Sequence, residues 1–198
     1  MIKRPAEPFS RVGIPQYLTG QLLIAMPTMS DPRFARSVIY ICFHSEKGAM
    51  GLVTNRLFSS ITFPELLDQL QVKVPAPVGD LRVHYGGPVD EGRGFVLHTT
   101  DFVREQTMLV DDEVALTATV DILRAIAEGE GPSQSFLALG YAGWDAGQLE
   151  NEVLANGWLH APADPAILFD ADIDTKWERA ITKLGGPLSM LSVEAGHA

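Results

Sequence analysis

The sequence predicts a single domain of the α+β class, and three observations lead to this prediction. The chain has 198 residues, of which 46% are apolar and 20% are charged, so it is long enough and apolar enough to bury a sizeable core. Segments with the short apolar pattern of strands alternate with segments that have the periodicity of helices. The sequence contains no internal repeat or long linker that would divide it, which favours one core over two.

The predicted strands are short runs rich in β-branched and aromatic residues that end at glycine, proline or acidic residues. The run at 37–43 is apolar on both faces, which is typical of a central strand covered on two sides. The predicted strands cover residues 18–25, 37–43, 48–53, 82–85, 94–99, 114–117 and 135–141.

The predicted helices are recognised by their apolar periodicity and by the residues at their ends. Thr62 and Glu65 have the spacing of a capping box, which predicts a helix start at residue 63. Gly129 follows an amphipathic segment and predicts its end, because glycine readily adopts the left-handed conformation that terminates helices. The predicted helices cover residues 63–71, 118–128, 146–155 and 175–184.

The two ends of the chain differ in composition from its middle. Residues 1–16 contain three prolines and few apolar residues, so we predict a flexible arm there, a single domain at 17–190 and a tail at 191–198. The arm has no apolar stretch of the secretory type, and the aliphatic run at 22–26 is far shorter than the roughly 20 residues of a membrane span. We therefore expect a cytoplasmic protein that makes no membrane contact.

The charge of the chain argues against nucleic acid as a partner. Fifteen basic and 25 acidic residues give a formal charge of −10, which repels a phosphate backbone. The best local basic stripe lies on the predicted last helix, with Lys176, Arg179 and Lys183 near one face. Because three acidic residues are close by, we interpret this segment as a solvated amphipathic helix rather than a recognition helix.

Cys42 is the only cysteine, so the chain has no intrachain disulfide and no thiolate-rich metal site. It lies inside an apolar run, where a cysteine is usually a small buried hydrophobic residue. His44 follows on the same predicted strand at a Cα distance of about 6.6 Å, which does not suit a nucleophile and its base. Whether Cys42 is reactive stays open, since a histidine from elsewhere in the fold could approach it.

Metal and cofactor motifs are missing from the sequence. The five histidines have neither HxxxH nor HExxH spacing, and the carboxylates do not form a calcium-loop pattern. The signatures GxSxG, GxxxxGK[ST] and GxGxxG are also missing. We therefore predict no metal and no cofactor.

The segment 140–150 combines a predicted strand, a glycine-rich turn and a helix start, an arrangement that binds phosphate in other proteins. Asp145 is placed to cap the helix with Gln148 three residues on, and nearby acidic residues repel anions, so we favour a cap over an anion site. Tyr141 and Trp144 could form the aromatic wall of a pocket for a neutral or cationic ligand, although core or rim packing is the more common role of such residues.

Between about residue 18 and residue 185 the chain resembles the YqgE/AlgH family of small bacterial proteins. The most specific match is the run Gly140–Trp144 followed by Gly147–Glu152. The resemblance implies a mixed β-sheet folded into a pseudo-barrel with flanking helices. It brings no established biochemical activity, because the AlgH name reflects a genetic link to alginate regulation and "transcriptional regulator" is only a family label. The other matching segments are Pro27 with 31–34, 48–55, 86–89, 94–98, Asn156 and Trp158.

The function predicted from the sequence is that of a noncatalytic regulatory or binding protein, because a set of polar and aromatic residues occurs without a catalytic signature. The partner is an unknown small molecule or protein, and the oligomeric state stays open. The alternative is an enzyme of unknown chemistry that uses His98 or Glu152 as acid or base in a cleft near the glycine-rich loops. The candidate cleft residues are Asn55, His98, Tyr141, Trp144, Gln148 and Glu152.

Overall fold

The computed structural model describes residues 17–75 and 81–184. The predicted arm at 1–16, the tail at 191–198 and the last residues of the predicted domain lie outside the described residues. The strands are β1 (Gln21–Ala25), β2 (Val38–Ser45), β3 (Gly48–Val53), β4 (Val83–Tyr85), β5 (Val89–Thr99), β6 (Met108–Leu109), β7 (Val114–Thr117), β8 (Ser135–Asp145) and β9 (Trp158–Pro162). The helices are α1 (Phe63–Gln69), α2 (Val120–Ala127), α3 (Gln148–Leu154), α4 (Pro165–Leu168) and α5 (Lys176–Lys183).

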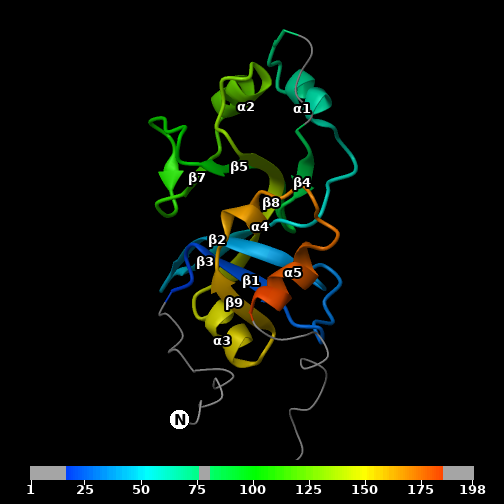
Figure 1. The fold of residues 1–198 in the computed structure, drawn as a ribbon, viewed down its shortest axis with the longest axis vertical. Helices are drawn as coiled ribbons and strands as arrows, with labels where there is room; N and C mark the ends of the chain where they lie inside the picture. Colours follow the sequence, from blue (N-terminus) through cyan, green and yellow to red (C-terminus); the bar gives the residue numbers. More distant parts are fainter. Residues whose placement is uncertain (1–16, 76–80, 185–198) are drawn as a thin grey trace, which may run out of the picture.

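Within the described residues nine strands form one curled sheet, a half-barrel with helices around it (Figure 1). The strand order is β6-β7-β5-β8-β3-β2-β1-β9, with antiparallel neighbours, and β4 pairs with β8 in parallel. The sheet is therefore mixed, and the predicted α+β domain with a pseudo-barrel sheet is confirmed.

Strand β8 joins the two ends of the molecule. Its first half pairs with β5, from Ser135 opposite His98 to Leu139 opposite Gly94, and its last residues pair with β3, ending with Asp145 opposite Gly48. Helices α1 and α2 lie at one end of the molecule and α3 lies at the other (Figure 1). Each end has a hydrophobic cluster of its own, and a third cluster between them includes residues of α4 and α5.

The pair Gly86–Gly87 allows the chain to cross over β8. A Cβ atom on Gly87 would lie 2.1 Å from the carbonyl carbon of Tyr141, and one on Gly86 would lie 2.2 Å from the carbonyl oxygen of Gly140. Since real Cβ atoms do not approach backbone this closely, only glycine fits at these two positions. The crossing carries the chain from β4, on one side of β8, to Val89 at the start of β5 on the other.

The segment 140–150 differs from its prediction. Strand β8 does not end before a glycine turn but continues to Asp145, because the small residues Ala142 and Gly143 follow a positive φ of 71° at Gly140 and pair with β3. Asp145 does not cap α3, whose N-cap is Gly147 with a φ of 74°. Instead the backbone N–H of Asp145 donates to Oε1 of Gln148 at 3.0 Å.

Other elements agree with the sequence to different degrees. The capping box is confirmed, since the Thr62 side chain accepts from the Glu65 N–H and the Glu65 carboxylate accepts from the Thr62 N–H. The short elements β6, β9 and α4 were not predicted. None of the helices in the described ranges is long and apolar enough to span a membrane.

Candidate functional site

A cleft of about 410 Å³ opens between α3 and the loop 26–36, and we call it the α3 cleft. Its lining includes the buried Trp144 and the exposed Gly143 near the end of β8, and also the exposed Val89. Its volume is within the range of ordinary small-molecule sites. The other lining residues are Met29, Asp31, Arg33, Phe34, Pro88, Gln148, Glu152, Ala155, Gly157 and Trp158.

The Glu152 carboxylate is the centre of the hydrogen bonds in this cleft. Its Oε2 accepts the indole N–H of Trp144 at 3.0 Å and that of Trp158 at 2.8 Å. Its Oε1 accepts the Nε2–H of Gln148 at 2.8 Å. Three donors from two strands and one helix therefore fix this carboxylate in a single orientation.

Helix α3 places these groups by its spacing and by its termination. Gln148 and Glu152 are four residues apart, so they lie on one face of the helix. The helix ends in a Schellman motif, in which Asn156 has a φ of 57° and the Gly157 N–H donates to the Glu152 carbonyl at 2.9 Å. The Gly157 carbonyl then accepts the Met26 N–H at 3.1 Å, which attaches the loop 26–36 to the end of α3.

Aromatic rings form the inner surface of the cleft. Trp144 and Trp158 are buried and meet edge to face with ring centres 6.2 Å apart. Phe34, from the loop 26–36, meets Trp158 in the same manner at 5.8 Å. The two indoles belong to the hydrophobic cluster beneath α3, so their N–H groups reach Glu152 from a rigid base.

The opposite wall carries an ion pair. The Arg33 guanidinium donates to both oxygens of the Asp31 carboxylate, with Nη2 2.7 Å from Oδ2, and the Arg33 backbone N–H also donates to Oδ1. The side-chain hydrogen bonds from Arg33 hold the pKa of Asp31 below its usual value. The pair is therefore a dipolar feature of the wall without net charge.

Asn55 and Arg56, in the loop that follows β3, hold this wall in place. The Arg56 guanidinium donates to the carbonyls of Pro32 and Ala35, at 3.1 and 2.7 Å. The Asn55 side chain accepts from the Val38 N–H and donates to the Arg36 carbonyl, both at 2.9 Å. Asn55, a predicted cleft residue, thus positions the loop but does not line the cleft.

Of the six predicted cleft residues, the structure brings Trp144, Gln148 and Glu152 together and places the other three elsewhere. Tyr141 packs on the opposite face of β8 from Trp144, where its ring meets Phe95 edge to face at 5.8 Å. Tyr141 is directed away from Trp144 because side chains alternate along β8, whereas His98 and Asn55 come from β5 and from the loop after β3.

His98 is sealed inside the sheet with an exposed fraction of 0%. Its Nδ1 lies 2.9 Å from the Thr99 carbonyl oxygen, and its Nε2 lies 2.9 Å from the Thr117 hydroxyl oxygen. Burial lowers the pKa of His98, because the interior disfavours the charged ring. Both ring nitrogens are engaged, and the residue does not face Glu152.

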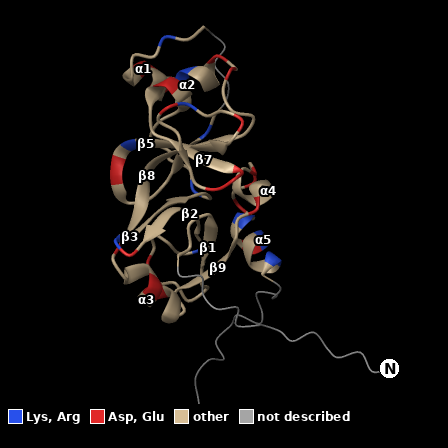
Figure 2. Cartoon of the chain, turned by 90° about the vertical axis from the view of Figure 1, so that its left-hand side faces the viewer, with Lys and Arg blue, Asp and Glu red and all other residues tan. Residues whose placement is uncertain are grey.

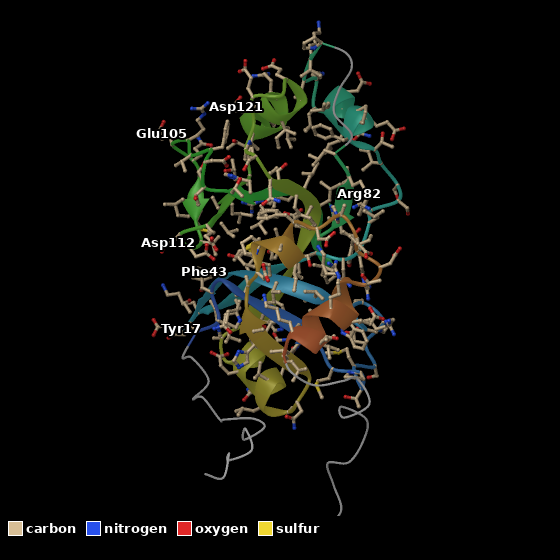
Figure 3. The ribbon with its side chains drawn as sticks, viewed as in Figure 1. Tyr17, Phe43, Arg82, Glu105, Asp112 and Asp121 are labelled. Carbon is tan, nitrogen blue, oxygen red and sulfur yellow. The ribbon has the colours of Figure 1, made fainter. Side chains whose placement is uncertain are left out.

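Thr117 is also part of a second hollow, about 430 Å³, which we call the α2 cavity. It lies between α2 and the connection from β5 to β6, where Figure 3 labels Asp121 and Glu105. Its wall includes exposed side chains of both signs, and the Arg104 guanidinium lies over the Phe102 ring at 4.6 Å. The other lining residues are Gln106, Thr119, Ile122, Arg124, Ala125 and Glu128.

Two other predictions concern single reactive groups. Cys42 is buried with an exposed fraction of 2%, and burial raises the pKa of its thiol. The predicted solvated basic stripe on α5 is wrong for Lys176, which is 1% exposed and donates to the carbonyls of Thr54 and Leu168 at 3.2 and 3.0 Å. Burial lowers the pKa of Lys176 to about 8.

The two remaining cations of that stripe are paired with carboxylates. Arg179 forms an ion pair with Asp170, and Lys183 forms one with Asp164. Basic and acidic residues accordingly lie side by side near α5, whereas the charged residues of α3 are acidic (Figure 2). In the described ranges, no group of three histidine, cysteine or carboxylate side chains is arranged to hold a metal ion.

The sequence reasoning did not assign Trp158, Phe34 or the Asp31–Arg33 pair to a site. These residues come from segments more than a hundred positions apart along the chain, and they meet only because β9 and β1 pair at the edge of the sheet. The available signal was their presence among the segments that carry the family resemblance.

The comparisons with known proteins agree with this architecture. The AlgH-like family profile matches residues 22–189. A UPF0301 protein of Rhodopseudomonas palustris strain BisB18 is 57% identical over 191 residues, covering 92% of this chain and 90% of the relative. A UPF0301 protein of Bradyrhizobium diazoefficiens is 56% identical over 190 residues, with coverages of 92% and 89%.

Two solved structures share the fold. The solution structure of the AlgH protein from Pseudomonas aeruginosa has 46% identity and a TM-score of 0.76, covering 96% of this chain and 100% of that protein. The crystal structure of protein DIP2367 from Corynebacterium diphtheriae has 23% identity and a TM-score of 0.72, with coverages of 89% and 92%, and this likeness concerns the fold alone.

Proposed function

This chain belongs to the AlgH-like family. Because the names of its relatives state no ligand or reaction, the proposal starts from the geometry of the site. We propose that the protein is a noncatalytic binding protein whose ligand occupies the α3 cleft. The ligand is a small molecule, and its binding serves a regulatory role in the cytoplasm.

One observation carries this proposal. The α3 cleft combines an apolar aromatic base with a carboxylate that three hydrogen bonds hold in a fixed orientation. Ligand sites commonly have this composition, in which apolar walls supply affinity and a few oriented polar groups supply specificity. The loop that closes the cleft is also fixed in advance by Arg56 and Asn55, which reduces the ordering cost of binding.

The same contacts favour binding over acid–base catalysis. A general acid or base must exchange a proton with a reacting group within hydrogen-bond reach. Protein donors take three of the four acceptor positions of the Glu152 carboxylate, and His98 has both ring nitrogens engaged in the interior of the sheet. The sequence-based alternative, an enzyme using either residue, therefore has less support from the geometry than a binding function.

The test is a binding screen read at the two indoles. We expect a metabolite mixture to shift the NMR signals of the Trp144 and Trp158 indole N–H groups while mass spectrometry finds every compound unchanged. Val89→Trp should abolish these shifts, because Val89 lines the cleft. Val120→Trp is the matched control, because Val120 does not line the cleft and is 39% exposed, nearly the same as the 38% of Val89.

Two results would overturn the proposal. Consumption of a compound at the rate of a catalyst, lost in Val89→Trp and kept in Val120→Trp, would show that the cleft is an active site. Shifts confined to residues around α2 would show that the ligand binds at the other end of the molecule.

A further inference from the structure

Resting on the proposed function, we infer that the ligand of the α3 cleft is a small organic cation, whose ammonium or guanidinium group binds beside Oε1 of Glu152. The charges around this carboxylate, its free acceptor position and its aromatic surroundings indicate this chemical class.

The charged side chains in the lining of the α3 cleft leave one negative charge unbalanced. The charged residues that line the cleft are Asp31, Arg33 and Glu152. Asp31 and Arg33 neutralise one another through several hydrogen bonds. In the part of the chain that the structure describes, no basic side chain forms an ion pair with Glu152. Glu152 is therefore the uncompensated charge of the cleft.

The Glu152 carboxylate also has hydrogen-bond capacity left for a ligand. A carboxylate oxygen accepts two hydrogen bonds in ordinary geometry. Oε2 of Glu152 already accepts from both indoles, whereas Oε1 accepts from Gln148 alone. One acceptor position on Oε1 remains, on a residue that lines the cleft. A charged N–H donor there would form a charge-assisted hydrogen bond, which is stronger than a neutral one.

The surroundings of this carboxylate attract cations and repel anions. Phe34, Trp144 and Trp158 line the cleft with aromatic rings, and the Arg33 guanidinium already lies over the Phe34 ring at 5.7 Å from its centre. Glu150 lies in the first turn of α3, whose charged residues are acidic (Figure 2), and the whole chain has a formal charge of −10. An anionic ligand would meet repulsion from each of these groups.

The experiment uses four probes that each join a short alkyl chain to a polar group and that differ in charge. They are n-butylammonium, n-butylguanidinium, n-butanol and butyrate, titrated into the full chain while the Trp144 and Trp158 indole N–H signals are followed by NMR. We expect the two cations to bind about tenfold more tightly than n-butanol, as one charge-assisted hydrogen bond implies, and butyrate to bind more weakly than n-butanol. Raising the salt concentration should weaken the binding of the two cations and not that of the other probes.

Glu152→Gln tests the residue itself. The amide keeps an oxygen for the indoles but removes the charge, so the preference for cations over n-butanol should disappear. Glu105→Gln, an exposed carboxylate of the α2 cavity, is the matched control and should keep the preference. If Glu152→Gln does not fold, the four probes and the salt titration on the wild type still decide the question.

The outcomes separate this inference from the proposed function. Equal binding of all four probes, tighter binding of butyrate, or no indole shift with either cation would overturn the cationic class. The proposed function would still stand if the metabolite screen gave a neutral or anionic compound that shifts the same indole signals. An arginine-containing peptide added in parallel distinguishes the source of the group, because a free small cation binds more tightly than the peptide if the cleft takes small molecules.

Discussion

The α3 cleft and the α2 cavity have nearly the same volume, about 410 and 430 Å³, but they are built in different ways. In the α3 cleft, two buried indoles and Gln148 donate to the Glu152 carboxylate, and a loop held by Arg56 forms the facing wall. In the α2 cavity, most polar side chains of the lining are exposed, and the buried Thr117 is already bonded to His98 and Thr107.

This difference shows why cavity size does not identify the site. An exposed side chain must give up conformational entropy to meet a ligand, whereas a side chain fixed by buried partners has already done so. In the α3 cleft, three N–H groups positioned by the fold donate to the Glu152 carboxylate, and one acceptor position on its Oε1 is left for a ligand. The α2 cavity offers charges of both signs that water already solvates. Prearranged chemistry, rather than volume, therefore selects the α3 cleft.

The largest effect that tests this comparison is expected from Glu152→Ala. The substitution removes the acceptor of two indole N–H groups on buried rings, Trp144 and Trp158. An unsatisfied buried donor costs roughly 1–3 kcal/mol, so the free energy of unfolding should fall by about 2–4 kcal/mol. Urea denaturation followed by tryptophan fluorescence measures this change.

The matched control is Glu105→Ala in the α2 cavity (Figure 3). Glu105 is exposed, so its substitution should change the free energy of unfolding by no more than about 0.5 kcal/mol. An equal fall in the free energy of unfolding of the two variants would contradict this contrast. It would show that the Glu152 carboxylate contributes no more to stability than an exposed carboxylate does.

A smaller effect is expected from Arg56→Ala, which acts on the facing wall. Loss of the hydrogen bonds to the Pro32 and Ala35 carbonyls should cost about 1–2 kcal/mol of unfolding free energy, since the group is partly solvated. Ligand affinity in the α3 cleft should also fall about tenfold, because the wall must then be ordered on binding. Calorimetric titration measures the affinity, and Arg104→Ala in the α2 cavity should leave it unchanged.

The fold was largely predictable because its signals are local. The capping box at Thr62 and Glu65 and the strand at 114–117 depend on neighbouring residues, and the structure has both. The continuation of β8 through Gly143 was missed, because its pairing with β3 is a contact between segments about ninety residues apart. Sequence patterns predict a turn at these glycines, whereas pairing with β3 places them in a strand.

The candidate site was only partly predictable, for a similar reason. Gln148 and Glu152 are related by helical spacing, and Trp144 is close to them in sequence, so their convergence follows from local geometry. His98 and Asn55 were grouped with them by residue type, which carries no information about the face of the sheet. Burial decides their places instead, with His98 inside the sheet and Asn55 beneath the loop.

A pH titration of stability sharpens the comparison at the α2 end of the molecule. Burial lowers the pKa of His98 in the folded state. Below about pH 6.5, His98 therefore binds a proton in the unfolded chain more readily than in the folded chain. The wild type should therefore lose stability relative to His98→Gln as the pH falls from 7 toward 5. His84 and His160, whose pKa values burial also lowers, are present in both proteins and cancel in the difference.

Urea denaturation of both proteins at several pH values gives this difference. A stability difference that does not change between pH 7 and pH 5 would mean that His98 titrates alike in the folded and unfolded chains. The ring would then be accessible to water, and the contrast between a sealed His98 and an open cleft would be lost.

The smallest effect is expected from Tyr141→Phe. Tyr141 lies on the face of β8 opposite Trp144, and its hydroxyl makes no hydrogen bond to the described residues. Removing the hydroxyl should change the free energy of unfolding by less than about 0.5 kcal/mol and leave the affinity of the α3 cleft within about twofold. A tenfold loss of affinity in calorimetric titration would instead show that the ligand reaches around the edge of β8 at Gly143, where the Tyr141 ring lies 3.3 Å from the place of a Cβ atom. The site would then extend over both faces of the strand, and its chemistry would include the phenol as well as the carboxylate.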